Sequence, residues 1–403
     1  MPVEDEAEAV AVLLPPPDAA RVVAELWEAG EAVVPLDPAA PAPDLRQSLG
    51  ALRPGALIDA DGRRRLPDGV PVAAGVAAVV ATSGTTGERK GVELTFAGLA
   101  ASGAAVASAI QADAAGGTWL CCLPLHLVAG LAVVGRAWVT GVPVTVHAGF
   151  DPAAVAAAAR GGTAFVSLVP TMLRRVLDRD PEAVAGFRHI LLGGGPIDPA
   201  LLVRAREAGA AVSTTYGMTE TWGGVVHDGH PLRGVDVRID PPADGGDIGE
   251  ILVRAPMLMR GYRLWSEGTA AAIDADGWYR TGDLGRFDPA AGGRMWVVDR
   301  LGDVVNTGGI KVSPTEVERV LAGHPAVAEV CVAGRPDPEW GQRVVAFVVP
   351  SGSTATPTLA DLRAFAGEQL PAAKLPRELV VVSAIPRTPG GKPVRRLLPP
   401  PGT

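Results

Sequence analysis

The chain has 403 residues, a hydrophobic fraction of 48% and a net charge of −8 at pH 7. These values suit a globular protein of two or three domains, and the negative charge excludes a general electrostatic attraction to nucleic acid or anionic membranes. The acidic start lacks the features of a signal peptide, no apolar run reaches the length of a membrane span, and three cysteines are too few for a disulfide framework. We therefore expect a cytoplasmic protein with no inserted membrane segment and with buried, inert thiols.

Short apolar runs alternate with helical segments through about residue 225. The apolar runs predict buried strands at residues 9–14, 32–37, 55–60, 76–81, 118–125, 142–148, 163–170 and 189–194. Helices are predicted at residues 18–30, 95–111, 151–160 and 198–209, several of them opening on Asp-Pro or Thr caps. This alternation predicts an α/β fold whose mainly parallel sheets are covered by helices on both faces.

The pattern changes in the last part of the chain. Strand-like runs at residues 235–239, 249–255 and 293–300 are separated by Gly and Asp turns, which predicts an antiparallel β section. From about residue 303, two helical and two strand-like segments follow at residues 313–324, 326–334, 342–350 and 359–370. They predict a small α+β domain of about 100 residues, the commonest domain size.

The segment TSGTTGERKG, at residues 82–91, places small hydroxylated residues among glycines and ends near Lys90. Such a loop is either a solvated turn or a cradle in which backbone N–H groups and hydroxyls bind phosphate oxygens. It is not a Walker loop, because two residues rather than four separate Gly84 from Gly87. It follows a predicted strand and precedes a helix that Thr95 is expected to cap, a setting typical of phosphate sites.

Six segments, in this order, resemble the motifs of the adenylate-forming superfamily, which contains acyl- and aryl-CoA ligases, luciferases and the adenylation domains of peptide synthetases. They are residues 82–91, 191–197, 214–221, 278–285, 298–318 and 386–396. The resemblance implies an acid–thiol ligase that uses ATP, Mg²⁺ and CoA and forms an acyl-adenylate. It also implies an N-terminal AMP-binding domain at residues 1–301 and a mobile C-terminal domain at residues 303–403, with a hinge near Gly302.

The resemblance also assigns site residues. The residues expected to bind phosphate are Ser83, Gly84, Thr85, Thr86, Gly87 and Lys90. Those expected to bind adenine are Gly193, Gly194, Gly195, Tyr216 and Gly217. Asp283 and Arg300 are expected to bind the ribose hydroxyls. Thr219 is expected at the α-phosphate, Glu220 as a Mg²⁺ ligand and Lys392 at the reacting centre. Outside these motifs, Glu220 or Asp283 would pass for an ordinary capping acid and Lys392 for a solvated lysine.

The chain departs from the family pattern in two places. Gly302 stands where the hinge is usually Asp or Lys, which permits rotation because glycine is the least restricted residue. Only about 80 residues precede the phosphate loop, fewer than in other members. We therefore expect a first layer that is incomplete or completed by a partner subunit in a homo-oligomer.

Residues 122–138, 165–177 and 193–209 resemble the o-succinylbenzoate–CoA ligases of menaquinone biosynthesis. Three residues are therefore expected at the acid: His126, Arg136 and Trp222. A charge in the apolar segment around Arg136 must find a partner or reach water. This residue is therefore expected to bind a second substrate carboxylate, to reach solvent at the end of its helix or to pair with a nearby acid. The alternatives are a ligase for another small aryl or medium-chain acid, an enzyme that loads a carrier protein, and an inactive nucleotide-binding relative.

Overall fold

A computed structural model describes residues 6–83, 89–112, 116–241, 246–352, 355–387 and 393–400. Contacts between residues divide the chain into two compact units. The first unit holds residues 1–237 and 253–279, and the second unit holds residues 238–252 and 280–403.

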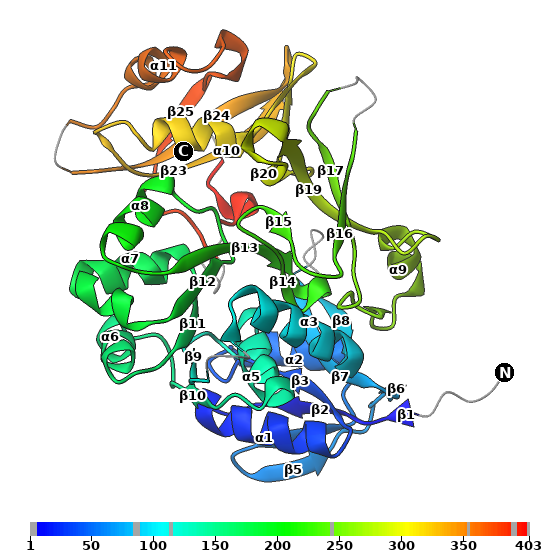
Figure 1. The fold of residues 1–403 in the computed structure, drawn as a ribbon. Coiled ribbons are helices and arrows are strands. Elements are labelled where there is room, and N and C mark those ends of the chain that lie inside the picture. Colours follow the sequence, from blue (N-terminus) through cyan, green and yellow to red (C-terminus); the bar gives the residue numbers. More distant parts are fainter. Residues whose placement is uncertain are drawn as a thin grey trace. The chain divides into compact units, whose positions relative to one another are not determined.

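The first unit contains two large sheets and a small one (Figure 1). One seven-stranded sheet has the order β18-β8-β7-β3-β2-β4-β5, with parallel pairs from β7 to β4 and antiparallel pairs at both sides. Its strands are β2 (Ala9–Val12), β3 (Ala32–Pro35), β4 (Ala56–Asp59), β5 (Gly62–Arg65), β7 (Val76–Ser83), β8 (Arg89–Thr95) and β18 (Gly261–Tyr262). Strands β1 (Glu6–Ala7) and β6 (Val72–Ala73) form a separate pair.

The second seven-stranded sheet has the order β10-β9-β11-β12-β13-β14-β15. Its first five strands are parallel and the last two are antiparallel. They are β9 (Trp119–Cys121), β10 (Val144–Val146), β11 (Phe165–Leu168), β12 (His189–Gly193), β13 (Val212–Met218), β14 (Gly223–His227) and β15 (His230–Pro231). The buried aliphatic residues of β11 and β12 explain why these strands read as continuous apolar runs.

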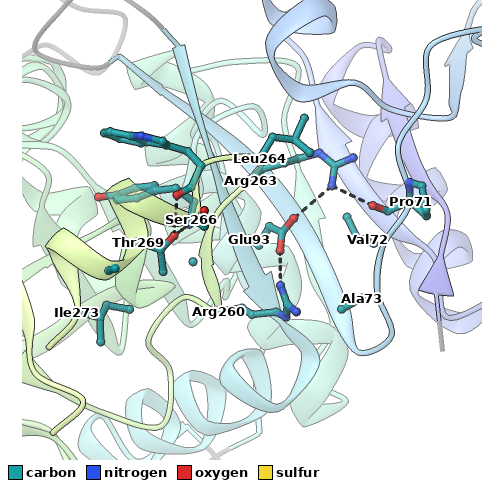
Figure 2. Close-up of a pocket in the computed structure, with 14 residues that line it drawn as sticks. Pro71, Val72, Ala73, Glu93, Arg260, Arg263, Leu264, Ser266, Thr269 and Ile273 are labelled. Atoms are coloured by element: carbon teal, nitrogen blue, oxygen red, sulfur yellow. Dashed lines mark hydrogen bonds and ion pairs between the residues drawn. The ribbon is translucent and has the colours of Figure 1, made fainter. Parts of the chain in front are cut away.

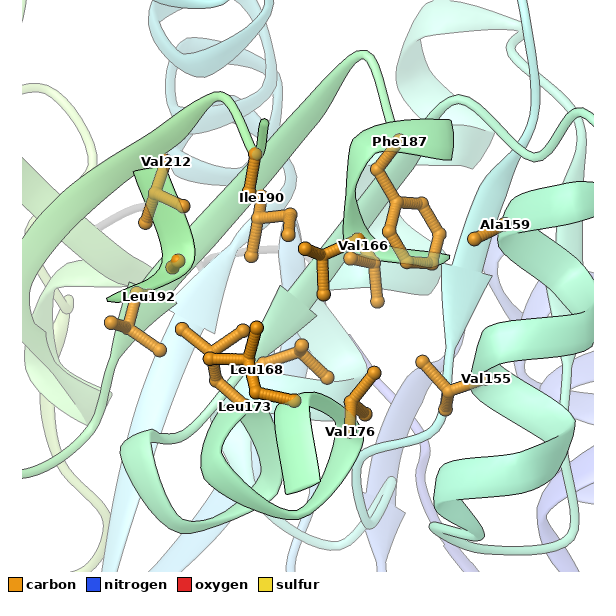
Figure 3. Packing of buried hydrophobic residues seen from close by; sticks show 14 of the residues in the cluster. Val155, Ala159, Val166, Leu168, Leu173, Val176, Phe187, Ile190, Leu192 and Val212 are labelled. Carbon is orange, nitrogen blue, oxygen red and sulfur yellow. The ribbon is translucent and has the colours of Figure 1, made fainter. Parts of the chain in front are cut away.

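Helices cover the sheets of the first unit. They are α1 (Pro16–Glu28), α2 (Ala42–Leu52), α3 (Phe96–Ala109), α5 (Val128–Thr140), α6 (Pro152–Arg160), α7 (Pro170–Arg179), α8 (Pro199–Glu207) and α9 (Ser266–Ala272), with the short helices η1 (Pro181–Gly186) and η2 (Thr219–Thr221). Helix α3 contacts strands of both large sheets, and α5 packs beside it against β9 and β14. Helices α6 and α7 bury Val155, Leu173 and Val176 against Val166 and Ile190 of the second sheet (Figure 3).

The second unit has its own core. It holds most of the sheet β16-β17-β19-β20 and a five-stranded sheet in which β25 pairs with the central β24. The strands are β16 (Asp236–Asp240), β17 (Gly249–Arg254), β19 (Tyr279–Asp288), β20 (Arg294–Arg300), β21 (Val305–Thr307), β22 (Ile310–Val312), β23 (Val327–Asp337), β24 (Gly341–Pro350) and β25 (Glu378–Val381). The helices are α10 (Pro314–Leu321), α11 (Leu359–Gly367), η3 (Pro289–Ala291), η4 (Ala372–Lys374) and η5 (Arg395–Leu397).

The predicted α/β class is confirmed, and so are the predicted helix caps. Asp151, Asp198 and Thr95 each accept a hydrogen bond from the first turn of their helix. The three cysteines are buried, and burial raises the pKa of each thiol to about 11 or 12. Within the described ranges, no helix is both long and apolar enough to cross a membrane.

Candidate active site

The predicted phosphate loop joins two antiparallel strands, and this corrects one part of the sequence interpretation. Strand β8 follows the loop, with Ser83 paired to Arg89, so the loop does not lead into a helix. Helix α3 begins only at Phe96, after Thr95, whose Oγ1 accepts from the amide N–H of Gly98 at 3.0 Å. The expectation that a helix N-terminus directly follows this loop is therefore wrong, and Lys90 on β8 is the described residue expected at the phosphates. Residues Gly84, Thr85, Thr86 and Gly87 lie outside the described residues, as does the side chain of Ser83.

Lys90 lies against two aromatic rings that the sequence analysis did not single out. Its Nζ is 4.4 Å from the ring centroid of Trp265 and 5.3 Å from that of Tyr262. Cation–π attraction at these distances holds the ammonium near the end of the loop. Because both rings come from a segment about 170 residues further along the chain, no local sequence signal predicts the contact.

Tyr262 also connects Lys90 to the predicted magnesium ligand. The Tyr262 hydroxyl donates to Oε1 of Glu220 at 3.1 Å, so one side chain contacts Glu220 with its hydroxyl and Lys90 with the face of its ring. Glu220 belongs to the short helix η2, whose first residue is Thr219. Its backbone carbonyl accepts from the amide N–H of Met259 at 2.7 Å, which anchors the turn.

The donor set around Glu220 fits a magnesium ion that is bound largely through a nucleotide. In the described part of the chain, no three His, Cys, Asp or Glu side chains form a group able to hold a metal by themselves. Mg²⁺ prefers oxygen ligands and is often held by one or two carboxylates together with substrate phosphates. Glu220 is one such carboxylate, so the fit is consistent with a Mg²⁺ ion delivered with ATP.

The same two rings line a surface pocket of about 800 Å³ (Figure 2). Its charged groups already bond one another: Arg260 and Arg263 each reach one oxygen of Glu93, at 3.1 and 3.2 Å. Arg263 also donates to the carbonyl oxygens of residues 52, 53, 70 and 71. This cluster is a structural clamp, and Lys90 lies over the rings of two lining residues, Trp265 and Tyr262.

The predicted adenine segment occupies two adjacent parallel strands. Gly193 at the end of β12 pairs with Thr215, the neighbour of Tyr216 on β13. A Cβ at Gly193 would lie 2.1 Å from Oγ1 of Thr215, and one at Gly217 would lie 1.8 Å from the carbonyl oxygen of residue 223. Close packing therefore requires glycine at both positions, a structural reason that holds alongside any role at adenine. Gly194, which follows with a φ of +80°, turns the chain away from the strand.

Asp283 and Arg300 are brought together in the second unit, as the predicted ribose pair requires. They face each other across the antiparallel strands β19 and β20. Nε of Arg300 donates to Oδ1 of Asp283 at 2.9 Å, while the arginine side chain stays 60% exposed. The two strands thus hold the pair together with the arginine exposed and Asp283 largely buried, and its role at ribose stays a prediction.

Three predicted acid-binding residues lie in the first unit in different environments. Trp222 is fully buried in a left-handed turn (φ +52°), and its indole N–H donates to the carbonyl oxygen of Thr95 at 3.0 Å. This contact packs η2 against the start of α3, so substrate contact by Trp222 stays a prediction. His126 is half-buried, with Nε2 3.8 Å from Oδ2 of Asp37, and burial lowers its pKa.

Arg136 neither reaches solvent at the end of its helix nor pairs with an acid in the described part of the chain. It lies in the middle of α5 with only 6% of its surface exposed, and within the described residues no carboxylate pairs with it. Nη2 donates to Oγ of Ser167 at 3.2 Å, and the guanidinium carbon lies 4.9 Å from the ring centroid of Trp119. Its Nε has no hydrogen-bond partner in the described part of the chain, and burial lowers the pKa of Arg136 to about 10.

His227, which the sequence analysis did not select, lies in the same region. It ends strand β14, is 8% exposed, and neither ring nitrogen finds a partner among the described residues. Burial, followed by the positive charge of Arg136, lowers the pKa of His227 to about 4. The only available sequence signal was a histidine at the end of an apolar strand, which is more often a satisfied core residue.

Lys392 lies outside the described residues, but the chain just beyond it is firmly held. Arg395 donates to Oδ2 of Asp303 at 2.9 Å and to Oε1 of Glu318 at 2.8 Å. It also donates to the carbonyl oxygen of Val332 at 2.9 Å. The residue after the predicted hinge is therefore bonded to the segment that follows Lys392. Gly302 itself has open space, since an added Cβ would meet no atom within 4 Å.

Comparisons with known proteins agree with this arrangement. Residues 66–263 match the family model of the AMP-binding enzymes, and residues 316–392 match that of the AMP-binding enzyme C-terminal domain. A probable 2-succinylbenzoate–CoA ligase of Mycobacterium tuberculosis is 39% identical over 353 residues, covering 85% of each chain. A 2-succinylbenzoate–CoA ligase of Geobacillus kaustophilus is 37% identical over 343 residues, covering 80% of this chain and 69% of its own.

Solved structures extend the likeness to the whole fold. The o-succinylbenzoate CoA synthetase of Bacillus subtilis, solved with its acyl-adenylate intermediate, matches with a TM-score of 0.85 and 29% identity. The match covers 97% of this chain and 87% of the synthetase chain, and the same synthetase has been solved with ATP and a magnesium ion. The ordered motifs, the two units and these likenesses lead to one conclusion: the chain belongs to the AMP-binding, adenylate-forming enzyme family and is an AMP-forming acid–thiol ligase.

Proposed function

We propose that this enzyme is a 2-succinylbenzoate–CoA ligase. In the first half-reaction a carboxylate oxygen of the acid attacks the α-phosphorus of ATP, forming an acyl-adenylate and releasing pyrophosphate. In the second, the sulfur of CoA attacks the acyl carbon, AMP leaves and the thiol proton passes to solvent. ATP supplies the leaving group that the free carboxylate lacks.

The observation that carries the choice of acid is the buried charge of Arg136. A guanidinium that is 6% exposed and unpaired among the described carboxylates is costly to keep in a free protein. A substrate with a second carboxylate would supply the missing negative charge. 2-Succinylbenzoate has such a group on its ring, while a medium-chain fatty acid would place a hydrocarbon tail against the charge.

The site residues are proposed to act mainly through charge. Lys90 and the preceding loop hold the β- and γ-phosphates, while Lys392 offsets the negative charge between the carboxylate and the α-phosphate. Mg²⁺, held by Glu220 and the phosphates, withdraws negative charge from the reacting phosphoryl group. After adenylation the C-terminal domain turns about Gly302, which removes Lys392 and admits the thiol. Because ATP and CoA are both cytoplasmic metabolites, we propose that the enzyme works in the cytoplasm.

The test is AMP release measured with ATP, Mg²⁺ and a panel of acids, using CoA and a free acyl-carrier protein as alternative thiols. The panel contains 2-succinylbenzoate, 3-benzoylpropionate (the same acid without the ring carboxylate), benzoate and octanoate. We expect 2-succinylbenzoate with CoA to give the highest kcat/KM. A higher value for octanoate or benzoate would replace the proposed acid, and a preference for the carrier protein would replace the thiol.

A further inference from the structure

The side chain of His227 is buried and unsatisfied in a way that packing does not explain. It is 8% exposed, and within the described residues neither Nδ1 nor Nε2 has a hydrogen-bond partner. Buried polar groups in proteins are almost always bonded, so an imidazole with two unmet nitrogens points to a missing partner. By contrast, His189 on the neighbouring β12 has its Nε2 3.0 Å from Oγ of Ser213.

The packing beside this imidazole is tight. His227 pairs with Thr215 across β13 and β14. A Cβ added to Gly224 would lie 3.2 Å from Nε2, which is tighter than an ordinary contact. Any larger residue at position 224 would therefore occupy the space next to Nε2. With glycine at position 224, no side chain of this residue fills the space next to the buried nitrogen.

The charged groups near His227 fix its protonation state. Burial, followed by the positive charge of Arg136, lowers the pKa of His227; Asp228 raises this pKa by less than Arg136 lowers it, and His189 lowers it least. The Asp228 carboxylate is engaged locally, since Oδ1 accepts from the backbone N–H of Thr214 at 2.9 Å. His227 is therefore neutral at physiological pH, with one N–H donor and one acceptor nitrogen.

Arg136 also carries a buried donor without a partner among the described residues, its Nε. Its Nη2 is engaged by Ser167 and its guanidinium plane by Trp119, but Nε has no partner among the described residues. Two buried donors, from helix α5 and strand β14, thus lack acceptors in the same region of the first unit. An anionic oxygen group is the ligand chemistry that satisfies both, because one carboxylate accepts several hydrogen bonds.

We propose that His227 is a specificity-determining residue that donates a hydrogen bond to the second carboxylate of the acid, beside Arg136. The inference rests on the proposed function and adds a residue to it. The two residues have different electrostatic roles. Arg136 supplies a positive charge that balances the carboxylate, and neutral His227 donates a hydrogen bond without adding a second charge. A protonated histidine here would make the empty site far more costly.

The experiment compares His227→Phe, which keeps a ring but no donor, with His227→Gln, which keeps a donor. The matched control is His189→Phe, a histidine of the same sheet whose ring is already bonded. For each purified full-length variant, kcat/KM for pyrophosphate release is measured with 2-succinylbenzoate and with 3-benzoylpropionate. The KM for ATP and the melting temperature check that the fold and nucleotide site are intact.

A lost hydrogen bond to a charged group predicts a fall of about 10- to 100-fold for 2-succinylbenzoate in His227→Phe. We expect less than a threefold change for 3-benzoylpropionate, partial recovery in His227→Gln and no selective loss in His189→Phe. Combined with Arg136→Met, the loss should be smaller than the product of the two single losses, because both residues hold one carboxylate.

An equal loss on both acids, or none, overturns the assignment of His227 while leaving the proposed ligase activity in place. The wild-type panel tests that activity separately. If the wild type prefers 3-benzoylpropionate, the proposed acid and the role of His227 both fail. If it prefers a different dicarboxylic acid, the same ratio is measured with that acid and its monocarboxylic analogue, and a selective loss supports His227.

Discussion

Replacing Arg136 with Met should change activity and stability in opposite directions. In the free protein the guanidinium is 6% exposed and has no carboxylate partner among the described residues. Removing the charge should therefore stabilise the free protein. It should also remove the group that meets the second carboxylate, and so weaken activity on 2-succinylbenzoate.

The magnitude follows from the electrostatics of the site. Burial lowers the pKa of Arg136 to about 10, against an ordinary value of about 12.5, and each step of 1 in pKa is worth about 1.4 kcal/mol. Keeping the charge thus costs on the order of 3 kcal/mol. Loss of the Trp119 and Ser167 contacts offsets roughly 1–2 kcal/mol of the gain. We expect Arg136→Met to raise the unfolding free energy by about 1–2 kcal/mol.

The activity change should be larger and selective. Truncating one partner of a buried charge pair costs about 2–5 kcal/mol, so kcat/KM for 2-succinylbenzoate should fall by roughly 30-fold to several thousand-fold. For 3-benzoylpropionate the change should be small or favourable. Urea unfolding without ligands and steady-state kinetics with both acids measure the two effects.

Arg175→Met is the matched control, because Arg175 also lies over an aromatic ring, 5.1 Å from the centroid of Phe150, but is exposed. Its stability should change by no more than about 0.5 kcal/mol and its activity not at all. If Arg136→Met lowers stability and reduces activity equally on both acids, Arg136 is structural and the argument for a dicarboxylic substrate is refuted.

Four further predictions follow from the same site. Lys392→Ala should slow adenylation by about a hundredfold or more, which corresponds to an electrostatic loss of roughly 3 kcal/mol, and should spare thioester formation from supplied acyl-adenylate. Equal losses of rate in both half-reactions would contradict a role in adenylation alone. Gly302→Pro should let adenylate accumulate while thioester formation falls, because proline restricts φ; Gly302→Ala is the control, and unchanged turnover in the proline variant would exclude this hinge. Asp283→Ala should raise the KM for ATP more than that for the acid, and an ATP KM within about twofold of wild type would remove it from the ribose site. His227 has a pKa of about 4 when folded and about 6.5 when unfolded, so between these pH values the unfolded state binds more protons. As pH falls from 6.5 to 4, the unfolding free energy of the wild type should therefore fall by up to about 3 kcal/mol relative to that of His227→Phe, and parallel stability curves in urea would contradict this.

Most of the fold was predictable because the residues that are buried follow the spacing of apolar residues along the sequence. Strands β2 and β3 are fully apolar runs, β12 is apolar after its first residue, and helices α6 and α8 open on Asp-Pro caps that the structure confirms. Strand β8 was missed because it begins with Arg89 and Lys90 directly after a glycine-rich loop. Its strand character comes from pairing with β7, a tertiary effect that local composition does not reveal.

The candidate site divides in the same way. Asp283 and Arg300 were identifiable because each lies in a motif, and the β19–β20 register brings them together. Tyr262 and His227 were not identifiable, because their significance depends on which distant side chains they meet. Motif spacing carries the chemistry shared by a family, whereas a buried polar residue shows its purpose only when its missing partners are visible.

The unmet polar groups of the proposed acid site would give a physical reason for selectivity. Apolar pockets distinguish acids weakly, since one methylene is worth only about 1–3 kcal/mol, whereas a buried donor left unbonded rejects the wrong ligand much more strongly. Arg136 and His227 are both more than nine-tenths buried and both lack a partner at one nitrogen or more among the described residues. An alkyl acid would bury these donors further without bonding them, while a second carboxylate would satisfy both. The free protein thus carries an electrostatic cost that a dicarboxylic substrate is suited to relieve. The buried groups lower the stability of the free protein and in return allow it to select a dicarboxylic acid.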